Sequence, residues 1–136
     1  MKNFDVQSAD LNVSKDFAFS YIANPVNLPS WAQAFASVGN GKALMRTPNG
    51  EVEINLIVKS SPEYGSVDWH MSFPDGNTAV AYSRVVRLTD SSCAYCFVLT
   101  PPPVPLELLE GALESQSKIL AEELVTLKRI LEAEFN

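Results

Sequence analysis

The sequence predicts an α+β fold: a curved antiparallel β-sheet of about six strands wrapped around a long C-terminal α-helix, with two short helices after the first strand. Apolar and polar residues alternate through the middle of the chain, which is typical of antiparallel strands with one covered and one wetter face. Consecutive prolines at 101–103 end this region, because proline cannot sit in a central strand. Beyond them, leucines recur at helical spacing to the end of the chain.

The N-terminal part of the chain predicts one strand and two short helices. Residues 4–11 are strand-like, although their alternation is weak. Ser14 stands where an N-cap is expected, and the short apolar run 17–22 follows it as the first helix. A second short helix is predicted at 29–35, and the glycines around 39–41 end it.

Five further strands are predicted in the middle of the chain, at 42–47, 51–59, 65–73, 78–88 and 93–100. Asn49-Gly50 predicts the hairpin turn between the first two of them. The strand at 65–73 alternates most clearly, with these residues on its apolar face: Val67, Trp69, Met71 and Phe73. Both faces of 93–100 are apolar, so alternation leaves the orientation of that strand open.

One long helix is predicted at about 106–134, roughly 45 Å long at 1.5 Å per residue. Its apolar stripe consists of Leu106, Leu109, Leu113, Leu120, Leu124, Leu127, Leu131 and Phe135. Gln116-Ser117 interrupts this stripe, which indicates either a kink or a position that faces a cavity. The opposite side is expected to be solvated, with pairs such as Glu114 and Lys118, and to carry Glu107, Glu110, Glu114, Glu122, Glu123, Glu132 and Glu134.

Length and composition limit the class of protein. The 136 residues correspond to a single domain, 1–136, and 46% apolar with 19% charged residues is a globular composition. The net charge of −6 argues against a nucleic-acid partner, which would require a cationic surface. No apolar run is long enough to span a membrane or to serve as an export signal. With only two cysteines, the sequence therefore predicts a cytoplasmic protein.

Several short strings occur in an order that matches a known superfamily: Asn24-Pro25, 28–32, 47–52, 64–68, Pro74-Asp75-Gly76, 83–86 and 124–132. In these strings the chain resembles the helix-grip superfamily, which includes START domains, polyketide cyclases, plant pathogenesis-related allergens and activators of heat-shock ATPases. It is most similar to a small bacterial SRPBCC or polyketide cyclase-like branch of unassigned function. The resemblance implies a helix-grip fold over nearly the whole chain, but it does not select one function, because this fold carries many.

Two motifs are weak candidates for chemistry. Relatives often carry a histidine where this chain has Trp69, and its single histidine, His70, follows on the opposite face of the strand. Cys93 and Cys96 have the spacing of redox and zinc motifs, but residues three apart on a strand face opposite sides. A zinc site also needs about four ligands. We therefore expect no metal site, no cofactor and no histidine-based triad.

Arg84 and Tyr82 are the strongest polar candidates. They share a strand face with Val80, Val86 and Leu88, and we expect this face to turn toward the helix. There the guanidinium would either anchor an anionic ligand group beside the Tyr82 hydroxyl, or form an internal ion pair or reach the rim of the pocket. The second interpretation is favoured.

The predicted function is binding of a small hydrophobic molecule, such as a lipid, an isoprenoid or a polyketide, between the sheet and the C-terminal helix. The ligand-binding candidates are Trp31, Phe35, Leu56, Trp69, Met71, Phe73, Tyr82 and Arg84. Each of these also suits an ordinary core, but together they have the composition of a ligand pocket. Trp31, next to a proline-rich turn, is the best candidate for a gate.

Two alternatives remain open. The chain could be a cyclase- or dehydratase-like enzyme in which Arg84 stabilises an oxyanion and Tyr82 donates a proton. The scarcity of inward-facing titratable groups favours binding over catalysis. It could instead be an interaction module similar to the heat-shock ATPase activators. An exposed apolar patch would then be formed by Tyr95, Phe97 and Leu99 if Ala94, Cys96 and Val98 are the inward set of that strand. The same patch would serve a homodimer.

Overall fold

A computed structural model describes residues 4–47, 50–100 and 106–135 of the chain. The predicted turn residue Asn49 and the prolines at 101–103 lie outside the described residues. The side chains of Thr47 and of both ends of the last helix are not described either. Several residues predicted on that helix lie at these ends: Leu106, Leu109, Leu113, Phe135, Glu107, Glu110 and Glu134.

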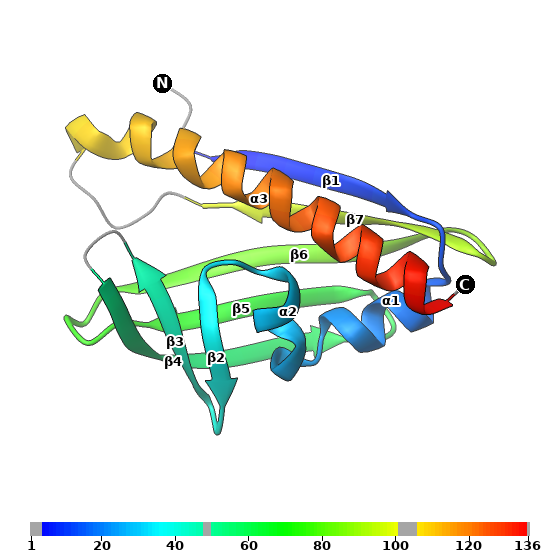
Figure 1. Cartoon of the computed structure of the whole chain (residues 1–136), viewed down its shortest axis with the longest axis horizontal. Coiled ribbons are helices and arrows are strands. Elements are labelled where there is room, and N and C mark those ends of the chain that lie inside the picture. Colours follow the sequence, from blue (N-terminus) through cyan, green and yellow to red (C-terminus); the bar gives the residue numbers. More distant parts are fainter. Residues whose placement is uncertain (1–3, 48–49, 101–105, 136) are drawn as a thin grey trace.

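The order of elements confirms the predicted α+β architecture and adds one strand (Figure 1). The strands are β1 (Asp5–Leu11), β2 (Phe35–Gly39), β3 (Lys42–Thr47), β4 (Gly50–Ser61), β5 (Ser66–Ser72), β6 (Thr78–Thr89) and β7 (Ser92–Leu99). The helices are α1 (Lys15–Ile22), the short 3-10 turn η1 (Pro25–Asn27), α2 (Leu28–Trp31) and α3 (Leu106–Phe135). Ser14 caps α1 as predicted, because its hydroxyl accepts a hydrogen bond from the N–H of Phe17 at 3.2 Å.

The seven strands form one open antiparallel sheet in the order β1-β7-β6-β5-β4-β3-β2. Figure 1 shows α1, α2 and α3 on the same, concave side of the sheet, with α3 running along β1 and β7. The helix therefore covers one part of the concave face, while α1 and α2 lie over another part.

The prediction of a helix at 29–35 is wrong beyond Trp31. Residues 35–39 leave the helix and form β2, which pairs with β3. Asn40 and Gly41 connect the two strands with positive φ angles of 56° and 75°. An Asn-Gly pair with this backbone is a typical two-residue hairpin turn, so these residues start a new strand instead of ending a helix.

The β5 strand confirms its predicted orientation, with Val67 fully buried and Trp69 3% exposed on the concave side. The predicted orientation of β6 is wrong. Ala81 lies opposite Trp69 in the ladder, and directly opposite residues share a face, so Ala81 faces inward. Tyr82 and Arg84 therefore point to the outer, convex face, where Tyr82 is 47% exposed.

A close backbone contact joins the β4–β5 turn to β6. Gly65 has a φ of +73°, and a Cβ at this position would lie 2.1 Å from the carbonyl oxygen of Val85. The N–H of Val85 donates to the carbonyl oxygen of Gly65 at 2.8 Å. Only glycine tolerates both the backbone conformation and this contact.

The long helix is continuous through Gln116-Ser117, so the gap in its apolar stripe is not a kink. The Ser117 hydroxyl donates to the carboxylate of Asp5 and accepts from the side-chain amide of Gln7 at 2.9 Å. The polar gap therefore matches polar residues of β1. No described helix is long and apolar enough to cross a membrane.

Candidate functional site

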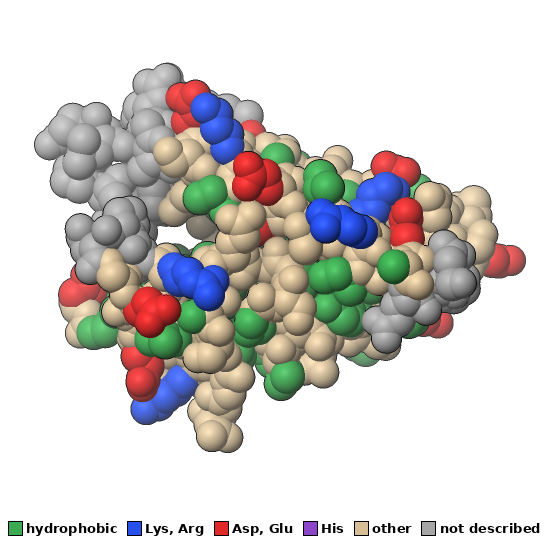
Figure 2. Space-filling model, in the orientation of Figure 1, with side chains coloured by type: hydrophobic (Ala, Val, Ile, Leu, Met, Phe, Trp, Pro, Cys, Tyr) green, Lys and Arg blue, Asp and Glu red, His purple; other side chains and the backbone are tan. Residues whose placement is uncertain are grey.

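The concave face of the sheet has a sealed end and an open end. At the sealed end, near α1 and the β4–β5 turn, these core residues are fully buried: Leu11, Ile22, Val67, Val85, Cys93 and Tyr95. At the other end of the strands, apolar side chains pack against the core but are only half-buried: Met45, Val52, Met71, Phe73 and Leu99. Figure 2 shows the molecule hollowed between α3 and the region of β3. The concave face thus offers apolar surface that the described side chains of α3 do not seal.

Six of the predicted ligand-binding residues lie on this concave side. Trp31, at the end of α2, and Phe35, at the start of β2, are buried, as are Leu56 of β4 and Trp69 of β5. The half-buried pair Met71 and Phe73 continues the same face of β5 toward the open end.

The other two candidates lie outside the site. Arg84 is exposed, and its Nε donates to the carbonyl oxygen of Tyr64 at 2.9 Å. Tyr82 lies on the same outer face. The His70 side chain also lies on that face, as predicted, opposite Ile57 in the ladder. The Arg84 and Tyr82 side chains are therefore not part of the concave site.

The orientation of β7, which alternation leaves open, places Tyr95 at the centre of the sealed end. Its ring contacts Trp31 edge-on, with centroids 6.2 Å apart and an interplanar angle of 84°, and Phe97 at 6.3 Å and 76°. Tyr95, Phe97 and Leu99 are thus the inward set, so the orientation that would expose them as a patch is not the one adopted. The outer face instead exposes a different apolar group: Val6, Ile57, Tyr82, Val86 and Leu88.

Three buried polar atoms in this region have no hydrogen-bond partner among the described residues. They are the indole Nε1 atoms of Trp31 and Trp69 and the hydroxyl of Tyr95. The Ser83 hydroxyl, which lies near the phenol, donates instead to the carbonyl oxygen of Val67 at 2.6 Å. A buried polar group without a partner costs about 1–3 kcal/mol, so this arrangement is expensive for a core that serves stability alone.

The surroundings of the Tyr95 hydroxyl keep it protonated. Burial is the main reason that its pKa is raised, and the negative charge of Glu123 adds to this effect. The Ser83 and Trp69 side chains, which approach the phenol oxygen without reaching hydrogen-bond geometry, lower the pKa by a smaller amount. The phenol is therefore neutral and available as a hydrogen-bond donor.

The structure corrects the prediction that Glu123 lies on the solvated side of α3, because this side chain is only 7% exposed. Its carboxylate accepts from the backbone N–H of Ala34 at 3.4 Å. Burial raises the pKa of Glu123 to about 7, against the lowering effect of the N–H groups of Ala34 and Gln33. The neighbouring Glu122 charge raises the pKa further. Its position, three residues after Leu120 and four before Leu127, was the available sequence signal that it lies on the apolar stripe.

Glu122 and Glu123 together connect α3 to the segment that follows Trp31. The Glu122 carboxylate accepts from the side-chain amide of Gln33 at 3.3 Å, and Glu123 contacts the next residue, Ala34. The position of Trp31 against Tyr95 is thus supported from α3 as well as from α2.

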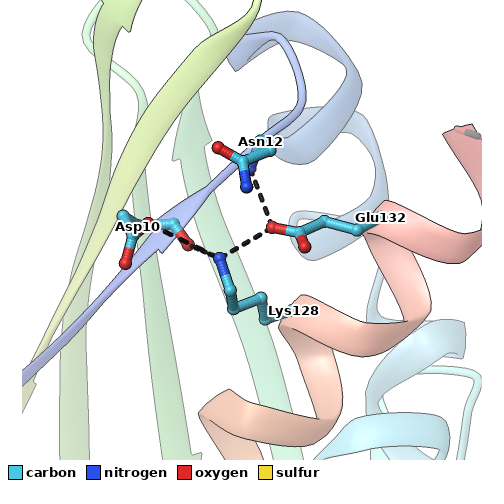
Figure 3. Close-up of polar contacts among 4 residues, drawn as sticks. All are labelled: Asp10, Asn12, Lys128 and Glu132. Carbon is cyan, nitrogen blue, oxygen red and sulfur yellow. Dashed lines mark hydrogen bonds and ion pairs between the residues drawn. The ribbon is translucent and has the colours of Figure 1, made fainter.

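The C-terminal half of α3 is held to β1 by a separate polar cluster (Figure 3). Lys128 Nζ donates to the carbonyl oxygen of Asp10 at 2.6 Å and to the Glu132 carboxylate at 2.7 Å. The backbone N–H of Asn12 donates to the same carboxylate at 3.0 Å. Hydrogen bonding to Lys128 is the main cause that lowers the pKa of Glu132.

The other candidate features do not form a site. Beside this cluster, a shallow groove of about 150 Å³ runs between β1 and α3 and is open to solvent. Both cysteines are free; Cys93 is buried, burial raises the pKa of its thiol, and Cys96 points to the other face. Among the described residues, no group of three or more histidine, cysteine or acidic side chains is arranged to hold a metal ion.

Comparison with known proteins yields structural relatives only. No family model and no curated protein sequence matches the chain. Among solved structures, the protein XoxI from Bacillus cereus superposes with a TM-score of 0.70 at 16% identity, covering 99% of both chains. A START superfamily protein from Mycobacterium smegmatis gives 0.67 at 10% identity, covering 97% of this chain and 99% of the other. The fold is START-like.

An aromatase/cyclase from a Streptomyces species superposes with a TM-score of 0.67 at 9% identity over 96% of this chain and 92% of its own. The predicted helix-grip architecture is thereby confirmed. At these sequence identities the structural similarity establishes the fold only, and the function has to be argued from the residues of the site.

Proposed function

We propose that this protein binds a small hydrophobic molecule between the concave face of its sheet and α3. The observation that carries the proposal is the contrast along that face. Aromatic and aliphatic side chains line it throughout, yet Met71 and Phe73 at the open end remain half-buried. A pocket that is mostly apolar and has a few convergent polar groups is typical of small-molecule sites.

In this proposal the walls of the pocket are the inward side chains of β3, β4 and β5, and its base is the aromatic group of Trp31, Trp69 and Tyr95, whose burial and ring contacts support this placement. Entry is from the open end, since the sealed end is fully buried. The START-like fold is compatible with this use, because solved structures of this fold include an aromatase/cyclase.

The test is native mass spectrometry of protein purified from its own host, followed by organic extraction of any bound mass. We propose a cytoplasmic location, so the ligand would come from inside the cell. A lipid, isoprenoid or aromatic polyketide in near-stoichiometric amount supports the proposal, and the same spectrum reports whether the protein is a homodimer. An empty protein whose tryptophan fluorescence does not respond to a panel of such molecules contradicts it.

Two variants locate the binding region. Met71→Glu places a charge on the apolar wall at the open end and should abolish retention of the ligand. Ile57→Glu is the matched control, because this side chain is 59% exposed on the outer face. Equal loss of the ligand in both variants would place the binding region outside the pocket.

One observation favours a second candidate function of the cyclase type. Glu123, with a pKa of about 7, lies near the neutral hydroxyl of Tyr95. A carboxyl group that titrates near the operating pH suits general acid–base catalysis. In that case Glu123 and Tyr95 replace the predicted Arg84 and Tyr82 as the polar groups of the site, and Glu123→Gln should abolish turnover without abolishing ligand binding.

A further inference from the structure

We propose that the ligand carries a carbonyl oxygen, and that this oxygen is bound at the sealed end by the hydroxyl of Tyr95 together with the indole N–H groups of Trp31 and Trp69. This inference rests on the proposed function and specifies which chemical group of the ligand reaches the base of the pocket. The observations behind it are the three buried polar atoms without a partner among the described residues and the charges that surround them.

The chemistry of the three atoms selects an acceptor. An indole N–H donates and cannot accept, and a phenol donates when it is protonated. Since burial keeps Tyr95 protonated, the base of the pocket presents donors from three side chains. A ligand oxygen at this position would satisfy groups that the protein itself leaves unsatisfied.

The surrounding charges select a neutral ligand group over an anion. Apart from the three donors, Ser83 and Glu123 are the only polar or charged side chains that are buried in the described part of the chain, so no buried cation balances a carboxylate or a phosphate. An anionic head would also be repelled by Glu123 whenever that group is ionised. A ketone or a similar carbonyl accepts hydrogen bonds without bringing a charge into the core.

The elements that carry the three donors differ in how firmly they are held. Trp69 and Tyr95 lie in β5 and β7, which are paired on both sides within the sheet. Trp31 ends the four-residue helix α2 and covers Tyr95 from the helical side. Trp31 is therefore the one of the three donors that the sheet does not hold and that α2 and α3 position instead.

The test compares two probes of nearly the same shape, 9-fluorenone and fluorene, which differ in a carbonyl oxygen. Equilibrium dialysis gives the ratio of their dissociation constants for the wild type, Tyr95→Phe and Trp69→Phe. Loss of one hydrogen bond corresponds to about tenfold in affinity, so Tyr95→Phe should reduce the preference for fluorenone about tenfold while fluorene binding stays unchanged. Because each variant is compared with both probes, their different solubilities cancel.

Phe97→Leu is the matched control. Phe97 packs edge-on against Tyr95 from the same strand but has no polar atom, so this variant alters the packing and leaves the donors in place. The fluorenone preference should survive in Phe97→Leu. If it falls there as much as in Tyr95→Phe, packing and not hydrogen bonding sets the preference, and the inference is wrong.

The remaining outcomes separate this inference from the proposed function. Binding of both probes with the same ratio in every variant overturns the carbonyl subsite and leaves ligand binding intact. Failure of both probes and of every hydrophobic ligand contradicts the proposed function itself. Independently of any ligand, Tyr95→Phe should leave the unfolding midpoint unchanged or raise it, because the hydroxyl has no partner to lose. A clearly lower midpoint would show that the hydroxyl is already satisfied within the protein, which also overturns the inference.

Discussion

The two ends of the concave face are built from the same strands but differ in what they contribute. At the sealed end, side chains such as Leu11 and Val85 have no contact with solvent, and the backbone approaches itself at Gly65. At the open end, equivalent positions on the same strands are only half-buried. The comparison indicates that stability is concentrated at one end of the sheet, whereas the other end leaves apolar surface for the proposed ligand.

The largest expected effect is that of Gly65→Ala at the sealed end. The new methyl group would meet the Val85 carbonyl oxygen at 2.1 Å, and the positive φ adds strain. We expect a loss of about 4 kcal/mol in the free energy of unfolding, measured by urea denaturation. Gly76→Ala is the control, because it also has a positive φ but open space around it, and about 1 kcal/mol is expected there. Equal losses would mean that the close contact is unimportant.

The second prediction compares large-to-small substitutions at a fully buried position of α3 and at a half-buried position of the open end. Leu127 of α3 is fully buried, so Leu127→Ala should lower the free energy of unfolding by about 3 kcal/mol. Met71→Ala at the open end removes a half-buried side chain and should cost about 1 kcal/mol. Both are measured by urea denaturation of the ligand-free protein. Similar losses would contradict the division between a stabilising end and a binding end.

The third prediction concerns pH. Because the folded pKa of Glu123, about 7, lies above the ordinary value of 4.5, folding favours its protonated form. Its contribution is fully present below about pH 4.5, declines as the pH rises to 7, and then stays constant. Because of Glu123, the free energy of unfolding of the wild type should fall by about 3 kcal/mol between pH 4.5 and 8. Glu123→Gln should lack this decrease, which is measured as the difference between the stability curves of the two proteins. Parallel curves would show that the carboxylate is solvated.

Glu132→Gln should have the smallest effect and the opposite pH dependence. Lys128 lowers the pKa of Glu132, so its stabilisation is present above the ordinary carboxyl pKa and is lost as the pH falls through the lowered value. Since both side chains are partly exposed, we expect 1 kcal/mol or less near neutral pH, reduced by salt. Glu114→Gln, which removes a more exposed pair with Lys118, should change nothing measurable in thermal unfolding. An equal effect in both variants would mean that the contacts of Glu132 with β1 add nothing.

The sequence allowed much of the fold to be predicted, because local signals agreed with the tertiary structure there. Ser14 caps α1, and the alternation along β5 places Trp69 inward. The β6 strand shows where such signals end. Its outer face carries the larger apolar residues, including Tyr82 and Leu88, so hydrophobicity alone favours the wrong orientation. The orientation of β6 is decided only by its pairing with β5, which places Ala81 opposite Trp69. This register depends on the tertiary structure and not on the local sequence.

The candidate site was predictable in its apolar part and not in its polar part. Trp31 and Trp69 followed from their positions, whereas Tyr95 depended on the orientation of a strand that is apolar on both faces. Glu123 was assigned to the solvated side because glutamate is seldom buried. Its position on the leucine stripe indicated the opposite, that the side chain is buried, and the structure confirms that indication.

The strand order has a consequence for how the chain folds. From β2 to β7, each strand pairs with the next one in sequence, so these six strands can assemble through local hairpins. In contrast, β1 has to wait for β7, and α3, which packs along β1, follows both. Since distant pairings form more slowly than local ones, we expect β1 and α3 to dock last. The side of the proposed binding site opposite the sheet would then be the final part to form, so a hydrophobic ligand should accelerate only the last phase of refolding.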